Sequence, residues 1–189
     1  MGCIQSEEAR EQQQEELEPA PQPLQHKVIV IGNSSVGKSS LVTSVMCRPF
    51  STEHRSTIGT AYASVEISPK DGMDPLELQV WDTAGEERFK SMTAFFYRKT
   101  QVAILVFDVQ SEESLRALRV WHEDITRVSP SVKFVLVGNK TDCEHEVSEE
   151  EANAMGQELA APVFWASAKT GEGVREVFQH AALLTLPPH

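Results

Sequence analysis

The chain has 189 residues and a mass of 21.0 kDa, with 40% apolar and 24% charged residues, which fits one soluble globular domain and a short tail. Its 28 acidic and 17 basic side chains give a formal net charge of −11, which argues against nucleic-acid binding, because such binding needs a basic face. Three scattered cysteines are too few for a disulfide framework and favour a reducing, intracellular compartment. The chain shows no signal-peptide pattern and no apolar run near the ~20 residues of a membrane span, so we expect neither a secreted nor an integral membrane protein.

Residues 1–25 differ in composition from the rest of the chain. Residues 7–18 read EEAREQQQEELE and are followed by PAPQPLQ, so few apolar groups offset the entropy lost on ordering. We predict a disordered, extended, acidic tail here, and a short helix over Glu7–Glu18 is the alternative. The domain proper is expected over residues 26–186, with a short C-terminal end at 187–189.

From Lys27 onward, short runs rich in β-branched and aromatic residues alternate with segments of helical period. The runs predict six strands, over Val28–Ile31, Ala61–Ile67, Leu76–Trp81, Val102–Asp108, Phe134–Val137 and Val163–Ala166. The periodic segments predict five helices, over Ser39–Met46, Phe89–Arg98, Ser114–Val128, Glu149–Leu159 and Val174–Leu184. The fourth helix begins with a capping box, Ser148-Glu-Glu-Glu151. The turn Pro69–Pro75 joins two strands without a helix, which indicates an antiparallel hairpin. Together these features predict a three-layer α/β sandwich with a six-stranded, mostly parallel sheet and its ligand at the carboxyl ends of the strands.

The segment after the first strand, Gly32-Asn-Ser-Ser-Val-Gly-Lys-Ser39, matches the phosphate-binding P-loop pattern G-x-x-x-x-G-K-[ST] in its expected strand–helix context. Backbone N–H groups of such a loop point at phosphates; Lys38 would reach the β- and γ-phosphates, and the Ser39 hydroxyl would bind Mg²⁺. Further on, Asp82 would hold Mg²⁺ through water, and the Gly85 N–H would meet the γ-phosphate. The phosphate-binding residues are expected to be Ser34, Ser35, Val36, Gly37, Lys38, Ser39 and Ser40. This loop alone leaves kinases, ATPases and GTPases open.

Two further segments, each at the end of a predicted strand, favour guanine. In Asn139-Lys-Thr-Asp142, the Asp142 carboxylate can accept from N1–H and N2–H of guanine, which adenine cannot supply. Lys140 can lay its apolar stem on the base, and Asn139 can brace the phosphate loop. In Ser167-Ala-Lys169, the Ala168 N–H can meet the guanine O6. The sequence therefore predicts a site for GTP or GDP with Mg²⁺; a P-loop kinase or ATPase remains the competing class.

Residues 27–180 resemble a small GTPase of the Ras superfamily, and the segments WDTAGEERF, STIG and SAK resemble its Rab branch, most closely the endosomal Rabs. The resemblance implies the P-loop NTPase fold and assigns Thr57 as the switch threonine that binds Mg²⁺ beside the γ-phosphate. It places Phe50 against the guanine edge and implies two switches, over residues 50–60 and 84–97, that are released when the γ-phosphate is lost.

The same resemblance implies partners. It predicts an exchange factor, a GTPase-activating protein and effectors that bind the GTP state, acting on a monomer. Tyr62, Trp81 and Phe96 are similar to the aromatic triad through which Rabs present their state to effectors. For Trp81, ordinary core packing is an equal alternative.

One departure from the Rab pattern concerns hydrolysis. Rabs carry glutamine after DTAG, and this chain carries Glu86. A carboxylate can accept a hydrogen bond from the attacking water, but it cannot donate to the γ-phosphate and adds negative charge there. With Lys38, Thr57 and Gly85, Glu86 completes the expected catalytic set. We expect a switch with slow hydrolysis; the alternative is a GTP-binding interaction module that seldom hydrolyses GTP.

The second departure concerns membrane attachment. Rabs end in prenylated cysteines, whereas this chain ends LTLPPH and has no cysteine after Cys143, so we expect no prenylation. Its start, Met1-Gly-Cys-Ile-Gln-Ser6, fits the N-myristoylation pattern at Gly2, with Cys3 available for S-palmitoylation. Two acyl chains would suffice for stable anchoring, where one alone is marginal. We expect a lipid-anchored protein on the cytoplasmic face of an endosomal or other vesicular membrane.

Overall fold

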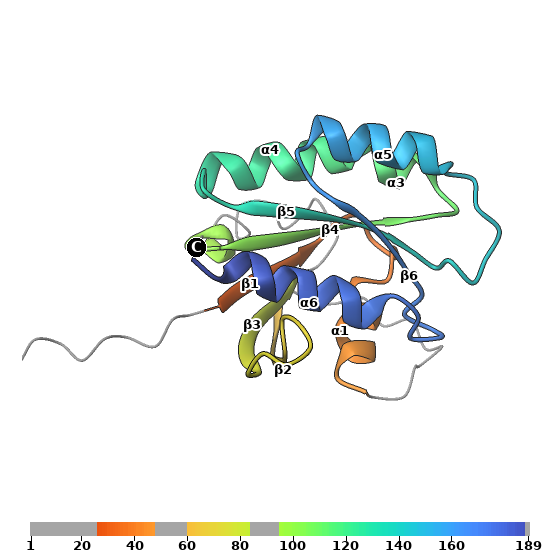
Figure 1. Ribbon diagram of the computed structural model, residues 1–189. Coiled ribbons are helices and arrows are strands. Elements are labelled where there is room, and N and C mark those ends of the chain that lie inside the picture. The colour runs from red at the N-terminus through yellow and green to blue at the C-terminus, as the bar shows by residue number, and fades with distance from the viewer. Residues whose placement is uncertain (1–25, 48–59, 84–94, 188–189) are drawn as a thin grey trace, which may run out of the picture.

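The computed structural model describes residues 26–47, 60–83 and 95–187, and these ranges form a three-layer α/β domain around one six-stranded sheet (Figure 1). The strands lie in the order β2-β3-β1-β4-β5-β6, and only the β2–β3 pairing is antiparallel. The strands are β1 (His26–Ile31), β2 (Thr60–Ile67), β3 (Leu76–Thr83), β4 (Val102–Asp108), β5 (Lys133–Asn139) and β6 (Val163–Ala166). The helices are α1 (Lys38–Val45), α3 (Glu112–Arg116), α4 (Leu118–Val128), α5 (Glu149–Glu158) and α6 (Val174–Thr185).

The six predicted strands and the hairpin are confirmed, whereas the prediction of one continuous helix over residues 114–128 is wrong. Ser111 begins that segment earlier, because its side chain accepts from the Ser114 N–H as an N-cap. Ala117, with φ −65° and ψ −19°, then separates α3 from α4. The helix predicted over residues 89–98 lies mostly outside the described ranges, and residues 95–97 of it are helical.

Alternate residues of the strands face two different helix layers. On β1, Val28 and Val30 lie in the cluster that α1 and α6 cover, and Ile29 and Ile31 lie in the cluster that α3, α4 and α5 cover. The central strand β4 is buried along almost its whole length, as expected of a parallel strand covered on both faces. In the described ranges, none of the helices combines the length and the hydropathy that a membrane crossing requires.

The strand register brings the predicted site segments to one edge of the sheet. Val30 pairs with Asp82, and Asn139 pairs with both Asp108 and Ala166. Loops that follow neighbouring parallel strands therefore meet at the carboxyl edge, where ligands of such folds bind.

Candidate functional site

The backbone of the predicted phosphate loop takes conformations that suit glycine. Gly32 has φ +150°, and a Cβ added there would lie 2.2 Å from the Val106 carbonyl oxygen. Gly37 has φ +93° and begins α1; a Cβ there would lie 2.2 Å from the Asn139 side-chain nitrogen. Because side chains at either position would collide with a neighbouring segment, the loop depends on these glycines to curl tightly over the edge of the sheet.

Lys38, the first residue of α1, carries a nearly buried amino group at the mouth of this loop. It is 6% exposed, and its Nζ donates to the Asn33 carbonyl oxygen at 2.7 Å. Burial lowers its pKa to about 8, and the nearby charge of Asp82 only partly opposes this. The first turn of α1 carries no acidic residue. A buried cation at a helix N-terminus is suited to a polyanion such as a triphosphate.

The predicted metal ligands Ser39 and Asp82 lie in contact. The Ser39 hydroxyl donates to Asp82 Oδ2, and Asp82 is 4% exposed. Its other oxygen, Oδ1, is buried and has no hydrogen-bond partner in the described part of the chain. Burial raises the pKa of Asp82, opposed by the Ser39 hydrogen bond and the Lys38 charge. Since a buried, unpartnered carboxylate oxygen is destabilising and Mg²⁺ prefers oxygen ligands, this pair fits a Mg²⁺ site.

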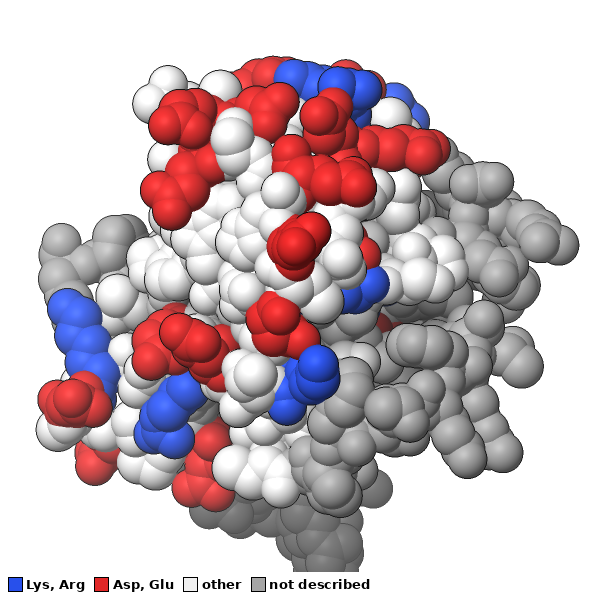
Figure 2. Space-filling model, turned by 90° about the vertical axis from the view of Figure 1, so that its right-hand side faces the viewer, with Lys and Arg blue, Asp and Glu red and all other residues white. Residues whose placement is uncertain are grey.

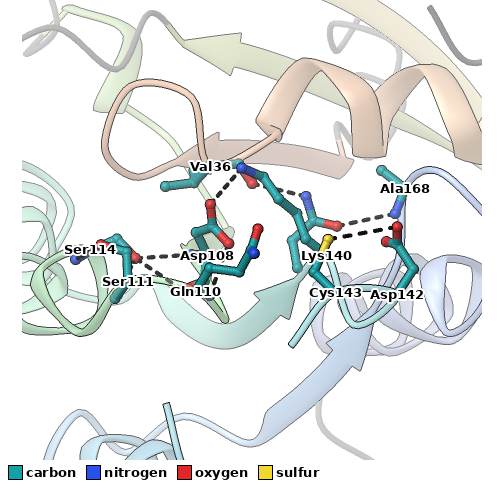
Figure 3. A network of polar contacts seen from close by, with 10 residues as sticks. Val36, Asp108, Gln110, Ser111, Ser114, Lys140, Asp142, Cys143 and Ala168 are labelled. Atoms are coloured by element: carbon teal, nitrogen blue, oxygen red, sulfur yellow. Dashed lines mark hydrogen bonds and ion pairs between the residues drawn. The ribbon is translucent and has the colours of Figure 1, made fainter. Parts of the chain in front are cut away.

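Asn139, at the end of β5, joins the phosphate loop to the segment after β6. Its Nδ2 donates to the Val36 carbonyl at 2.8 Å, and its Oδ1 accepts from the Ala168 N–H at 3.1 Å (Figure 3). The bracing expected of Asn139 is therefore present in the geometry. The Ala168 N–H, expected to meet the guanine O6, is directed to Asn139 in this structure.

Asp142 is held as an anion by two neighbours from the Ser167–Lys169 segment. It accepts from the Ser167 hydroxyl at 2.6 Å and from Lys169 Nζ at 3.0 Å. The Ser167 hydrogen bond, followed by that of Lys169, lowers the pKa of Asp142. Lys140 instead directs its Nζ to Asp108, at the end of β4 (Figure 3). A fixed carboxylate at this edge can accept two parallel N–H groups from a purine.

Other predicted site residues lie outside the described ranges. They are Gly2, Cys3, Phe50, Thr57, Gly85 and Glu86. Ser34, Ser35 and Ser39 are exposed at the loop, while Val36 is buried and Ser40 half-buried.

The three aromatic residues of the predicted triad are in contact. The ring centroids of Tyr62 and Trp81 lie 5.4 Å apart, and those of Trp81 and Phe96 lie 5.7 Å apart. Trp81 is half-buried and also packs against the core, whereas Tyr62 is 53% and Phe95 70% exposed. Both interpretations of Trp81 thus agree with its position: it packs inward and joins a solvent-facing aromatic surface.

The surface around the carboxyl edge is rich in acidic side chains. Figure 2 shows this side of the molecule, where Asp and Glu are spread over the described surface and a group of Lys or Arg atoms lies among them at the top. The first turn of α5 is acidic as well, with Glu149, Glu150 and Glu151. Because such a surface repels anions, binding of a phosphate depends on the local donors of the loop and on Lys38.

The sequence did not indicate the part that Trp121 and the Asn33 side chain play at this site. Trp121 lies on α4, and its indole Nε1 donates to Asn33 Oδ1 at 3.0 Å. The pattern of α4 marks Trp121 only as a core-facing residue, and nothing in the loop motif requires an amide at its second position. No local signal could have paired them.

Comparison with known proteins identifies the relatives of this chain. The family model described as "Ras family" matches residues 27–186. RABG3f of Arabidopsis thaliana, a Ras-related protein, is 40% identical over 163 residues, which cover 81% of this chain and 78% of that protein. The Ras-related protein Rab7 of Cenchrus ciliaris is 39% identical with the same coverage. The Ypt/Rab-type GTPase ypt7 of Schizosaccharomyces pombe is 38% identical over 85% of this chain and 82% of its own length.

Proposed function

The chain belongs to the Ras family of small GTPases, in its Rab branch, and we propose that it is a GTP-binding switch of endosomal or other vesicular traffic that hydrolyses GTP slowly. Regulation of membrane traffic is the general role of Rab-branch proteins. The slow turnover and the particular membrane are our proposal.

The nucleotide part of the proposal rests on two groups at the same site: the buried amino group of Lys38 and the buried, unpartnered carboxylate oxygen of Asp82. Lys38 is 6% exposed at the N-terminus of α1, and Asp82 Oδ1 is buried without a hydrogen-bond partner in the described ranges. A phosphate group beside Lys38 and a Mg²⁺ ion beside Asp82 would satisfy both.

In the proposed complex each residue has a separate task. Lys38 and the N–H groups of residues 34–39 would stabilise phosphate charge, while Ser39, Thr57 and Asp82 would hold Mg²⁺, whose positive charge would offset that of the phosphate oxygens. Asp142 reads the guanine edge, and Asn139 keeps the loop and the base segment in register.

Glu86 occupies the position that orients the attacking water, and its carboxylate adds negative charge where negative charge develops. A tenfold change in rate corresponds to only ~1.4 kcal/mol of barrier, so this one substitution is expected to slow turnover measurably. The second candidate function, a GTP-bound interaction module with almost no turnover, follows from the same residue.

Single-turnover hydrolysis of preloaded GTP tests the proposal, comparing the native protein with Glu86→Gln. Measurable native turnover, made faster by glutamine, supports the slow switch. Turnover that appears only in Glu86→Gln supports the interaction module.

Base specificity is tested in parallel by thermal shift with GDP and ATP. We expect protection by GDP and none by ATP, because Asp142 has no pair of donors to accept from on adenine. Equal protection by ATP would place the protein with P-loop kinases or ATPases and contradict the proposal.

A further inference from the structure

We propose that Trp121 is a positioning residue of the phosphate loop: its indole N–H holds Asn33 in place and so slows the release of bound nucleotide. The inference rests on the proposed nucleotide site. It assigns a role to a residue of α4 that lies outside every sequence motif of that site.

The contact joins two segments that are distant in the chain. Trp121 Nε1 donates to Asn33 Oδ1 at 3.0 Å across a separation of 88 residues. An indole N–H can only donate, so the bond also fixes which way the Asn33 amide points. The bond is partly buried, which shields it from competition with water.

Asn33 is linked to the site at two of its atoms. Its side-chain oxygen accepts from Trp121, while its backbone carbonyl oxygen accepts from Lys38 Nζ at 2.7 Å. A displacement of Asn33 would therefore move the loop backbone and, with it, the carbonyl oxygen to which the Lys38 amino group donates.

The loop needs external supports because its own backbone preferences are weak. Between Gly32 and Gly37 the chain includes Ser35 at φ +65°, a left-handed conformation that a serine adopts at some energetic expense. Asn139 supports the far end through the Val36 carbonyl, as described above. The Trp121–Asn33 bond supports the near end, so the loop is held at both sides.

The support on the α4 side is rigid. Trp121 is 5% exposed, and its helix neighbours Leu118 and Ile125 are fully buried in the same core cluster. Because the Trp121 ring is close-packed in the core, it stays in place when the phosphate loop moves. The hydrogen bond is thus a fixed point from which the loop is positioned.

The test is the release rate of mant-GDP from three variants: Trp121→Phe, which keeps a ring and removes the donor, Asn33→Ala, which removes the acceptor, and the double variant. A neutral hydrogen bond of this kind corresponds to roughly 2- to 10-fold in release rate. We expect each single variant to release faster by about that factor, and the double variant to release no faster than the singles. This non-additivity would show that the two residues act through one bond.

Ile125→Val is the matched control, since it loosens the packing of α4 without touching the loop. We expect it to lower thermal stability while leaving mant-GDP release unchanged. Faster release in Ile125→Val, unchanged release in the single variants, or additive effects in the double variant would each overturn the proposal.

Two further measurements keep the test decisive. Asn33 is half-exposed on a loop, so Asn33→Ala is expected to fold even if Trp121→Phe does not. In the Asn33→Ala variant, the Trp121 indole proton should exchange with solvent faster than in the native protein. An unchanged exchange rate would contradict the bond. Failure of the native protein to bind mant-GDP would overturn the proposed nucleotide site itself, an outcome distinct from unchanged release among variants that bind.

Discussion

At the scale of single residues, Lys38 and Asp82 both have shifted pKa values, and a bound ligand would change them. Burial lowers the pKa of Lys38 to about 8 and raises the pKa of Asp82, so both charged forms are disfavoured without a partner. Phosphate would favour the charged lysine, and a divalent cation would favour the charged carboxylate. Binding and protonation are therefore linked at this site.

The first prediction is that nucleotide binding takes up a proton at high pH. Near pH 7, Lys38 is charged both free and bound, so no uptake occurs on its account. Near pH 9 the Lys38 amino group is mostly neutral in the free protein, whereas phosphate in the complex raises its pKa. Binding therefore takes up as much as about one proton at this pH, and the affinity falls by up to about tenfold for each unit that the pH rises. Calorimetric titrations in two buffers of different ionisation enthalpy measure this uptake.

Lys38→Arg is the control for that measurement. Its guanidinium stays charged at pH 9, so the difference in uptake between pH 7 and pH 9 should vanish. Equal uptake by the native protein at both pH values would contradict the assignment of Lys38 to the phosphates.

At the scale of elements, helix starts are set by short-range hydrogen bonds. On α5, the Ser148 hydroxyl accepts from the Glu151 N–H, and the Glu151 carboxylate accepts from the Ser148 N–H, which is the capping box that the sequence predicted. The bond from the Ser148 N–H, followed by a second bond that the Ser148 hydroxyl donates to the same carboxylate, lowers the pKa of Glu151. Their contribution to stability is present above the ordinary glutamate pKa and is lost as the pH falls through the lowered one.

Replacing this cap gives the second prediction. Ser148→Ala should destabilise the protein by about 1 kcal/mol, because it leaves a helix N–H without its acceptor. Urea unfolding of the GDP-loaded protein should show a lower midpoint with an unchanged slope. Glu150→Ala, in the same turn but outside the box, serves as the control and should shift the midpoint less; equal shifts would mean that charge, and not capping, stabilises this end of α5.

At the scale of the whole molecule, the two ends of the domain lie side by side, away from the nucleotide edge (Figure 1). His26, which begins β1, has its Nδ1 2.8 Å from the hydroxyl of Thr185, which ends α6. Lys133 at the start of β5 donates to the Leu184 carbonyl at 2.7 Å. An anchor on residues 1–25 would therefore hold the domain from the same end as an anchor placed after α6.

Membrane attachment through that end is the third prediction. Gly2→Ala should move the protein from the membrane fraction to the soluble fraction of cells, because it removes the myristoylation site. Cys3→Ser should have a similar effect, since one acyl chain binds only marginally. Cys47→Ser, at an exposed cysteine, is the control and should leave the membrane fraction as in the native protein, and GDP binding should be the same in all three. Unchanged membrane association of Gly2→Ala would contradict the lipid anchor.

The amino-acid pattern was enough to predict the alternation of strands and helices, the hairpin, the capping box and the phosphate loop, because these depend on side-chain periodicity and on hydrogen bonds between near neighbours. Four features became visible only in the folded domain: the break at Ala117, the burial of Lys38, the unpartnered oxygen of Asp82 and the contact of Trp121 with Asn33. Such features arise where segments far apart in the chain pack together, as Trp121 and Asn33 do across 88 residues. Local patterns carry no information about these distances, because close packing in the folded core sets them.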